Sequence, residues 1–191
     1  MSDRVPRSLV VGPGQGRSLR NPVGGSIEVK ALGEQTGEGL SAFETDAAPG
    51  EGPPFHSHAD THEVLYFVEG TFRVRLEDAV HDAPAGTFVF VPKDVPHTWQ
   101  NSGDTSGRLL ALFTPASHGM EDFFQRFAAT TGASVADAFA ELAPGAGMYR
   151  RGFKGEAQRL ARDLGVHVVS PLDGVRPGQL HGAQAVLILG G

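Results

Sequence analysis

The chain of 191 residues contains no cysteine. Disulfide bonds, thiolate metal ligands and cysteine nucleophiles are therefore excluded. Long apolar runs are missing as well: none exceeds five residues, as in residues 185–189, whereas a helix that spans a bilayer needs about 20. Residues 1–16 also lack the apolar core of a signal peptide. We therefore expect a soluble, cytoplasmic protein with no membrane partner.

Positive charge is scarce, because 16 Lys and Arg stand against 22 Asp and Glu, which gives a formal charge of −6. Binding of nucleic acid phosphates needs clustered Lys and Arg side chains. One basic group occurs late in the chain, within residues 150–162, but Glu156 interrupts it and Asp163 follows it. We interpret this group as a solvated helix face, and no nucleic-acid partner is expected.

What the chain does have is an informative arrangement of histidines in residues 50–70 and 86–101. His56 and His58 stand two residues apart, so on an extended strand both imidazoles leave the same face. Glu63 and His97 complete a mixed set of nitrogen and oxygen ligands, which suits a first-row divalent metal. The sequence therefore predicts a metal site made of His56, His58, Glu63 and His97.

The central part of the chain has the pattern of an all-β protein. Short apolar segments alternate with Gly- and Pro-rich breaks, and in residues 71–77 apolar and polar side chains alternate strictly. Many short strands without long helices between them indicate a sandwich or barrel. The expected strands are residues 27–32, 40–45, 63–68, 71–77, 87–91, 97–100 and 108–114.

The pattern changes near residue 119. Met120, Phe123, Phe124 and Phe127 recur at helical spacing, and further helices are predicted over residues 134–142 and 154–164, with a short edge strand at 166–169. We therefore divide the chain into an irregular N-terminal arm (1–24), a β-barrel (25–118) and a helical C-terminal extension that packs on the barrel (119–191).

The two histidine-containing stretches resemble the two sequence motifs of the cupin superfamily. Gly50, His56, His58, Glu63 and Gly70 match every position of the first motif. The second motif is matched by Gly86, Pro92, His97 and Asn101, while Asp94 replaces a glycine. Asp tolerates positive φ better than most residues, so the turn is expected to persist. The resemblance implies a double-stranded β-helix, or jelly roll, with all four ligands pointing into the barrel.

The inward direction of Glu63 requires a break in the strand. His58 and Glu63 are an odd number of residues apart, so a continuous strand would place them on opposite faces, and a turn or bulge is expected at residues 60–61. With Glu63 inward, Leu65 and Phe67 also point inward as pocket walls, and Trp99 accompanies His97. His62 then faces outward. Such apolar walls beside one metal suit an organic, aromatic substrate.

The predicted site has the composition of a catalytic metal centre, since three imidazoles and one carboxylate leave open coordination positions. The metal would act as a Lewis acid, and Glu63 is the ligand able to accept a proton. Residues 56–63 and 90–97 and the Phe-rich segment after the barrel look like those of small actinobacterial flavonol dioxygenases of quercetinase type. That resemblance implies ring opening with O2, Glu63 as the base, and one divalent metal as the cofactor. The candidate metals are iron, manganese, cobalt, nickel and copper, and zinc is a further candidate. It also implies a homodimer.

Two other functions remain open from the sequence. The same Lewis-acid site would serve an oxygen-independent isomerase, cyclase or decarboxylase that acts on a small molecule. A decarboxylase would be expected to place an Arg near the metal, but alternation puts Arg73 and Arg75 outside the barrel. A non-catalytic small-molecule-binding module is the third interpretation. Sensor proteins of the cupin superfamily are usually fused to a DNA-binding domain, and no helix-turn-helix motif precedes the barrel here.

Overall fold

The structure is a computed structural model that describes residues 6–21, 25–129, 142, 148–150, 167–169 and 186–188. The chain divides into two units, residues 1–150 and 151–191. Within the described ranges, neither helix is long and apolar enough to cross a membrane. The first unit contains both helices, the barrel and the candidate site.

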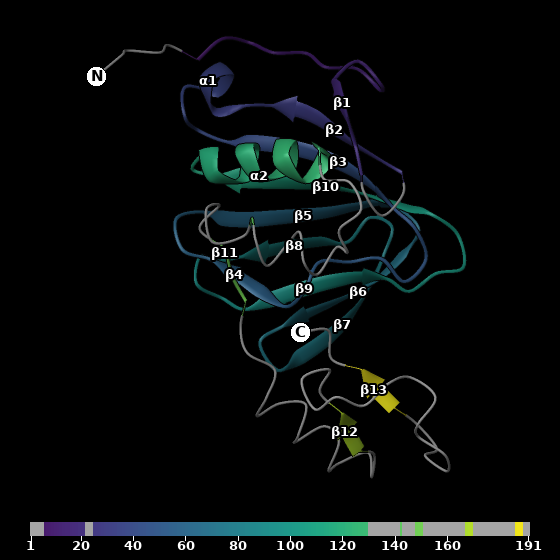
Figure 1. The fold of residues 1–191 in the computed structure, drawn as a ribbon. Helices are drawn as coiled ribbons and strands as arrows, with labels where there is room; N and C mark the ends of the chain where they lie inside the picture. The colour runs from purple at the N-terminus through teal and green to yellow at the C-terminus, as the bar shows by residue number, and fades with distance from the viewer. Residues whose placement is uncertain are drawn as a thin grey trace. The chain divides into compact units, whose positions relative to one another are not determined.

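The chain order of the elements follows the predicted alternation of short strands and turns, with one longer helix after the barrel (Figure 1). The elements are β1 (Arg17–Arg20), β2 (Ser26–Ala31), α1 (Gly33–Thr36), β3 (Ser41–Ala47), β4 (His56–His58), β5 (His62–Glu69), β6 (Thr71–Leu76), β7 (Ala79–Pro84), β8 (Phe88–Val91), β9 (His97–Asn101), β10 (Gly107–Thr114), α2 (His118–Ala129), β11 (Met148–Arg150), β12 (His167–Val169) and β13 (Val186–Ile188).

Two antiparallel sheets form the first unit. One sheet has the strand order β1-β2-β3-β10-β5-β8, and the other has the order β11-β4-β9-β6-β7. Figure 1 shows β5 and β8 of the first sheet above β9, β6 and β7 of the second. From β3 to β10 the chain alternates between the two sheets at every step except β6 to β7, as in a jelly roll. The expected all-β core is confirmed.

The inner faces of the two sheets form one apolar core. Along β6, Phe72 and Val74 are fully buried, while Thr71 and Arg73 are exposed, so the predicted alternation is confirmed. The ring centroids of Phe67 on β5 and Phe72 on β6 lie 4.6 Å apart, which joins the two sheets directly. This burial of large side chains from both sheets supplies most of the hydrophobic stabilisation of the barrel.

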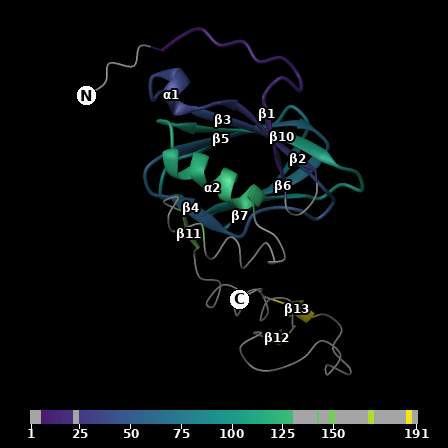
Figure 2. The same ribbon diagram turned by 45° about the horizontal axis from the view of Figure 1, so that its top comes forward.

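Helix α2 follows β10 and lies across the barrel (Figure 2). Its buried side chains Met120, Phe123 and Phe127 join the barrel core, which confirms the helix predicted from their spacing. Of the expected helix over residues 134–142, only Leu142 is described, and it is helical and buried. The expected helix over residues 154–164 lies outside the described residues. The edge strand expected at 166–169 corresponds to β12, which pairs in parallel with β13.

The expectation of an irregular arm is wrong for residues 17–20, which form β1 and pair with β2. Strands β7 and β11 were not predicted either. All three are the outermost strands of their sheets, and the side chains of β1 and most of those of β7 are exposed or only partly buried. Such strands are held by backbone hydrogen bonds to one neighbour, so they carry no apolar alternation in the sequence.

A buried carboxylate ties α2 to the rest of the first unit. Glu121 Oε1 accepts hydrogen bonds from the Ser41 hydroxyl at 2.6 Å and from the Gly33 backbone N–H at 2.7 Å. Ser41 is completely buried and Glu121 nearly so. The carboxylate therefore satisfies two donors, one at the start of α1 and one on β3.

We predict that Glu121→Ala lowers the free energy of unfolding by about 1–3 kcal/mol, because two donors lose their acceptor. Gln125→Ala, on the exposed face of the same helix, is the matched control and should change the free energy by less than about 0.5 kcal/mol. Urea unfolding of the three proteins gives the comparison. Equal stability of the Glu121 and Gln125 variants would contradict the assignment.

Candidate metal centre

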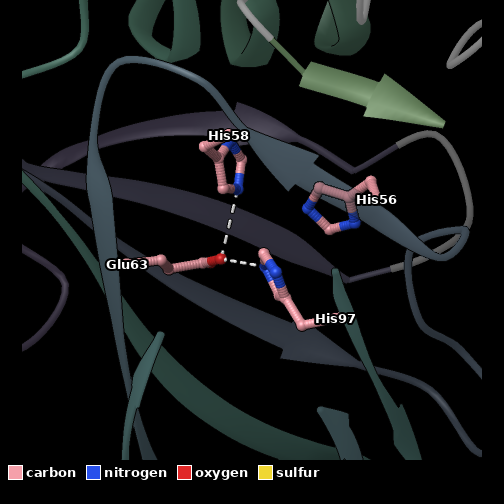
Figure 3. A group of neighbouring side chains, drawn as sticks. All are labelled: His56, His58, Glu63 and His97. Carbon is pink, nitrogen blue, oxygen red and sulfur yellow. Dashed lines mark hydrogen bonds and ion pairs between the residues drawn. The ribbon is translucent and has the colours of Figure 1, made fainter. Parts of the chain in front are cut away.

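The four predicted ligands come from three strands in two sheets and point toward one another (Figure 3). His56 and His58 lie on β4, which pairs with β9 so that His56 stands opposite His97. Glu63 approaches on β5 from the other sheet, where it stands opposite Phe113 of β10. One antiparallel pairing therefore brings the three imidazoles together, and the facing sheet supplies the carboxylate.

A break in the strand turns Glu63 inward, as predicted. Strand β4 ends at His58, β5 begins at His62, and the intervening residues are not part of a strand. The Thr61 hydroxyl anchors the break by donating a hydrogen bond to the Pro115 carbonyl at 2.8 Å. His62 faces away from the cluster, and its Nδ1 accepts a hydrogen bond from the Lys93 backbone N–H at 3.0 Å.

The turn before β9 holds the second motif against the first. Asp94 adopts a φ of 67°, so the positive φ expected where Asp replaces glycine is confirmed. Its backbone N–H donates to the His58 carbonyl at 2.7 Å. The turn that delivers His97 is thereby tied to the strand that carries the other two imidazoles.

The four side chains form a compact, buried group. The four candidate ligand atoms all lie within 4.8 Å of one another, and each residue is at most 5% exposed. Glu63 Oε2 lies 2.6 Å from His97 Nε2 and 3.2 Å from His58 Nε2. Three imidazole nitrogens and one carboxylate oxygen around one point fit a first-row divalent ion by number and by type.

Backbone carbonyls orient two of the imidazoles. His56 Nδ1 donates to the Pro54 carbonyl at 2.7 Å, and His97 Nδ1 donates to the Val95 carbonyl at 2.9 Å. A carbonyl only accepts, so the proton sits on Nδ1 and Nε2 is left to bind a metal, an arrangement typical of metal-ligating histidines. His58 Nδ1 is buried and has no hydrogen-bond partner among the described residues.

The electrostatics favour the neutral form of His56 and the ionised form of Glu63, both of which a metal needs, whereas they favour the protonated form of His97. Burial, together with repulsion from the other two imidazoles, lowers the pKa of His56 to about 3, so this ring is neutral at pH 7. Burial opposes the charge of Glu63, but hydrogen bonds from His58 and His97 outweigh it and lower its pKa. Burial likewise opposes protonation of His97, whereas the hydrogen bond and attraction to Glu63 raise its pKa.

The cluster opens onto a cavity of about 420 Å³ between the two sheets and α2. Its walls are mainly apolar and aromatic, which suits an organic ligand. Trp99 lines the cavity. Leu65 and Phe67 point inward and are fully buried, but neither is among the described lining residues, so they support the cavity rather than face it.

Sequence reasoning missed two parts of this cavity. One is the wall made by α2, whose Phe123, Phe124 and Phe127 were interpreted as packing on the barrel. An apolar helix face does not reveal whether it covers a core or a cavity. The other is a polar group, Asn21, Thr45 and Glu51, which also lines the cavity. These three residues come from separate segments and share no spacing that could have identified them.

Residues 43–113 match the family model described as Cupin domain. This barrel has the cupin fold. Protein SchB of Streptomyces halstedii is 37% identical over 67 residues, which are 35% of this chain and 49% of SchB. The match therefore spans about half the length of this curated relative.

Two solved structures share the cupin fold of this chain. KdgF from Halomonas sp. has a TM-score of 0.52 at 18% identity, and an RmlC-like cupin from Shewanella frigidimarina has a TM-score of 0.51 at 25% identity. In both comparisons the match covers 61% of this chain and 99% of the other. These likenesses support the cupin superfamily, and the cluster is a group that could bind a metal, as in cupins. One fold hosts many reactions, so the reaction must be inferred from the site.

We predict that His97→Ala abolishes retention of a divalent metal, because it removes one nitrogen ligand and the group that holds Glu63. His62→Ala is the matched control, since His62 neighbours the cluster in sequence but faces away from it. Metal content after reloading and desalting, measured by plasma mass spectrometry, gives the comparison. Full occupancy in the His97 variant would contradict the ligand assignment.

The metal-free protein should lose stability on acidification below pH 6.5. Between pH 6.5, the ordinary pKa of His56, and about pH 3, its folded pKa, His56 is neutral in the folded protein and protonated in the unfolded chain. In this range the free energy of unfolding therefore falls by about 1.4 kcal/mol for each pH unit of acidification. Glu63, whose pKa is lowered, adds a loss in the same direction below its ordinary value of 4.5. His97, whose pKa is raised, contributes stability that is lost only as the pH rises above 6.5.

The measurement is the free energy of unfolding of metal-free protein between pH 6.5 and 4.5, where His56 alone of these three groups should contribute. His56→Gln should flatten the slope relative to the unsubstituted chain. An unchanged slope would contradict the buried, neutral state of His56.

Proposed function

We propose that this chain is a metal-dependent dioxygenase that cleaves a flavonol-like or other enolisable aromatic substrate with O2. The observation that supports this most strongly is the position of the buried cluster, which opens onto a cavity with aromatic walls. A ligand that enters the cavity meets the cluster on one side and mainly apolar and aromatic side chains elsewhere. Planar aromatic molecules with an enolic hydroxyl match both features.

A divalent metal held by His56, His58, Glu63 and His97 would supply Lewis acidity toward the substrate hydroxyl and, if it were iron, manganese, cobalt, nickel or copper, a means of engaging O2. Zinc would supply the Lewis acidity alone, because it has no redox chemistry. The four side chains fit either kind of ion.

The proton of the substrate hydroxyl can pass to Glu63. Its carboxylate lines the cavity and is buried among the imidazoles of His56, His58 and His97. A divalent metal held by these residues would favour the ionised carboxylate, which would make Glu63 a weak base. It therefore suits a substrate whose hydroxyl is itself acidic, as an enolic hydroxyl is.

The cavity walls orient the substrate and keep water away from the cluster. Phe113 packs edge-on against His58, with ring centroids 5.4 Å apart, and Trp99 lines the cavity from β9. Phe123 and Phe124 close the side formed by α2. A planar ring held between such side chains presents its edge, and the hydroxyl on it, to the cluster.

Among the oxygen-independent alternatives, a decarboxylase is disfavoured. Its carboxylate substrate would find no Arg or Lys in the described lining of the cavity to pair with. An isomerase or cyclase that needs only Lewis acidity and Glu63 is compatible with the same site. A binding module without turnover would use the same cavity. Dependence on O2 separates the dioxygenase from both.

Metal-stripped protein reloaded separately with iron, manganese, cobalt, nickel, copper or zinc should consume O2 in step with loss of quercetin for at least one redox-active ion. Glu63→Gln should lower this rate by about 100-fold or more, since it removes the proton acceptor. His62→Ala should keep the rate within about twofold, because its side chain faces away from the cluster.

An oxygen electrode and the absorbance of quercetin give the two readouts. Conversion of quercetin without oxygen uptake would replace the dioxygenase with an oxygen-independent reaction, and quercetin binding without conversion would favour the binding module. The homodimer implied by the sequence resemblance stays a prediction, which light scattering of the purified protein would test.

A further inference from the structure

The cavity has a second polar group, formed by Asn21, Thr45 and Glu51, which we call the distal polar cluster. Asn21 is 5% exposed and Thr45 is 8% exposed. Asn21 Nδ2 donates to Glu51 Oε1 at 2.6 Å and contacts the carbonyl of Asp46, the residue after Thr45, at 3.4 Å. The Ala48 backbone N–H donates to Glu51 Oε2 at 2.7 Å. Backbone contacts thus hold this cluster in place.

Strand register places the distal polar cluster at the opposite end of the cavity from the metal centre. On β10, Phe113 stands opposite Glu63, and Leu109, four residues earlier, stands opposite Thr45. Four residues of antiparallel strand correspond to about 13 Å. Strand β9 gives the same offset between the two groups. Asn101 lies four residues after His97, and its backbone N–H donates to the Glu51 carbonyl.

The hydroxyl of Thr45 is available to a ligand. Thr45 lies on the inner face of β3 between the buried Phe43 and Ala47, and it lines the cavity. None of the hydrogen bonds among the described residues uses its side-chain hydroxyl, although the residue is more than nine-tenths buried. Its neighbours across the strands, Ile27 and Leu109, are apolar. Because the hydroxyl belongs to a residue that lines the cavity and has no protein partner among the described residues, a polar group of a ligand can form a hydrogen bond with it.

The chemistry of the distal polar cluster selects a neutral hydroxyl group. The Thr45 hydroxyl both donates and accepts, and the Glu51 carboxylate accepts. A carboxylate or phosphate on the ligand would approach Glu51 with no Arg or Lys in the described lining to compensate. Burial raises the pKa of Glu51, which agrees with its position at the edge of an apolar space.

We propose that the distal polar cluster binds a phenolic hydroxyl on the end of the substrate remote from the metal centre, with Thr45 as a specificity-determining residue. The separation of the two polar ends further means that the substrate contains more than one ring. This inference rests on the proposed function, because it assumes that an aromatic substrate places its enolic hydroxyl at the metal centre.

The test compares two probes that differ by one group. The first is a flavonol without ring substituents, and the second carries one hydroxyl at the para position of its pendant phenyl ring. Binding to the metal-loaded protein is measured without O2 by titration calorimetry. The unsubstituted chain should bind the hydroxylated probe about five- to tenfold more tightly, as expected for one net hydrogen bond.

Thr45→Val removes the hydroxyl and keeps the shape, so it should reduce this preference to less than about twofold without weakening the binding of the unsubstituted probe. Thr45→Ser should keep the preference, since it retains the hydroxyl. Ile27→Val, at the same end of the cavity, is the control for altered packing and should change both affinities by the same factor. Thermal unfolding verifies that each variant is folded.

The outcomes separate the two proposals. Equal affinity for both probes in the unsubstituted chain, or a preference that survives in Thr45→Val, overturns the inference even if O2 is consumed with quercetin. A preference that depends on Thr45 without any oxygen uptake supports the inference and overturns the dioxygenase. Failure of the metal-loaded protein to bind either probe overturns both.

Discussion

The carboxylate of Glu63, surrounded by imidazoles in the interior of the barrel, is the interaction on which the rest of the site depends. A buried charge is costly unless it is paired and hydrogen-bonded. Here the imidazoles of His58 and His97 lie 3.2 and 2.6 Å from one carboxylate oxygen. The same nitrogen and oxygen atoms, gathered in an apolar interior, are the atoms that would bind a metal ion. The feature that is hardest to bury is therefore also the group that could bind a metal.

The barrel assembles this group with few residues. The pairing of β4 with β9 places His56 opposite His97, and the break between β4 and β5 sends Glu63 across from the facing sheet. Asn101 secures the far end of β9 through hydrogen bonds from its Nδ2 to the Ala47 and Thr105 carbonyls. Because all four candidate ligands lie on strands, the site is held by the scaffold. Substrate specificity can then be set by other residues that line the same cavity.

Much of this arrangement is readable from the sequence, because the responsible patterns are local. The spacing of His56 and His58, the odd separation of Glu63, and the substitution of Asp94 for a glycine each predicted a feature that the structure has. The β7 strand was not predictable, since most of its side chains are exposed and it lies at the edge of its sheet, paired with β6. The distal polar cluster was hidden for a different reason. Asn21, Thr45 and Glu51 meet only through the strand register and the backbone contacts of two loops, which no local pattern records.

The central claim is that three imidazoles and one carboxylate hold a single divalent metal in the cavity of this cupin barrel. X-ray absorption spectroscopy of the metal-reloaded protein tests it most directly, because imidazole rings give a distinct multiple-scattering signature. We predict one tightly bound ion per chain with three imidazole nitrogens and at least one oxygen in its first coordination shell. A bound ion without imidazole ligands, or failure to bind an ion in stoichiometric amount, would contradict it.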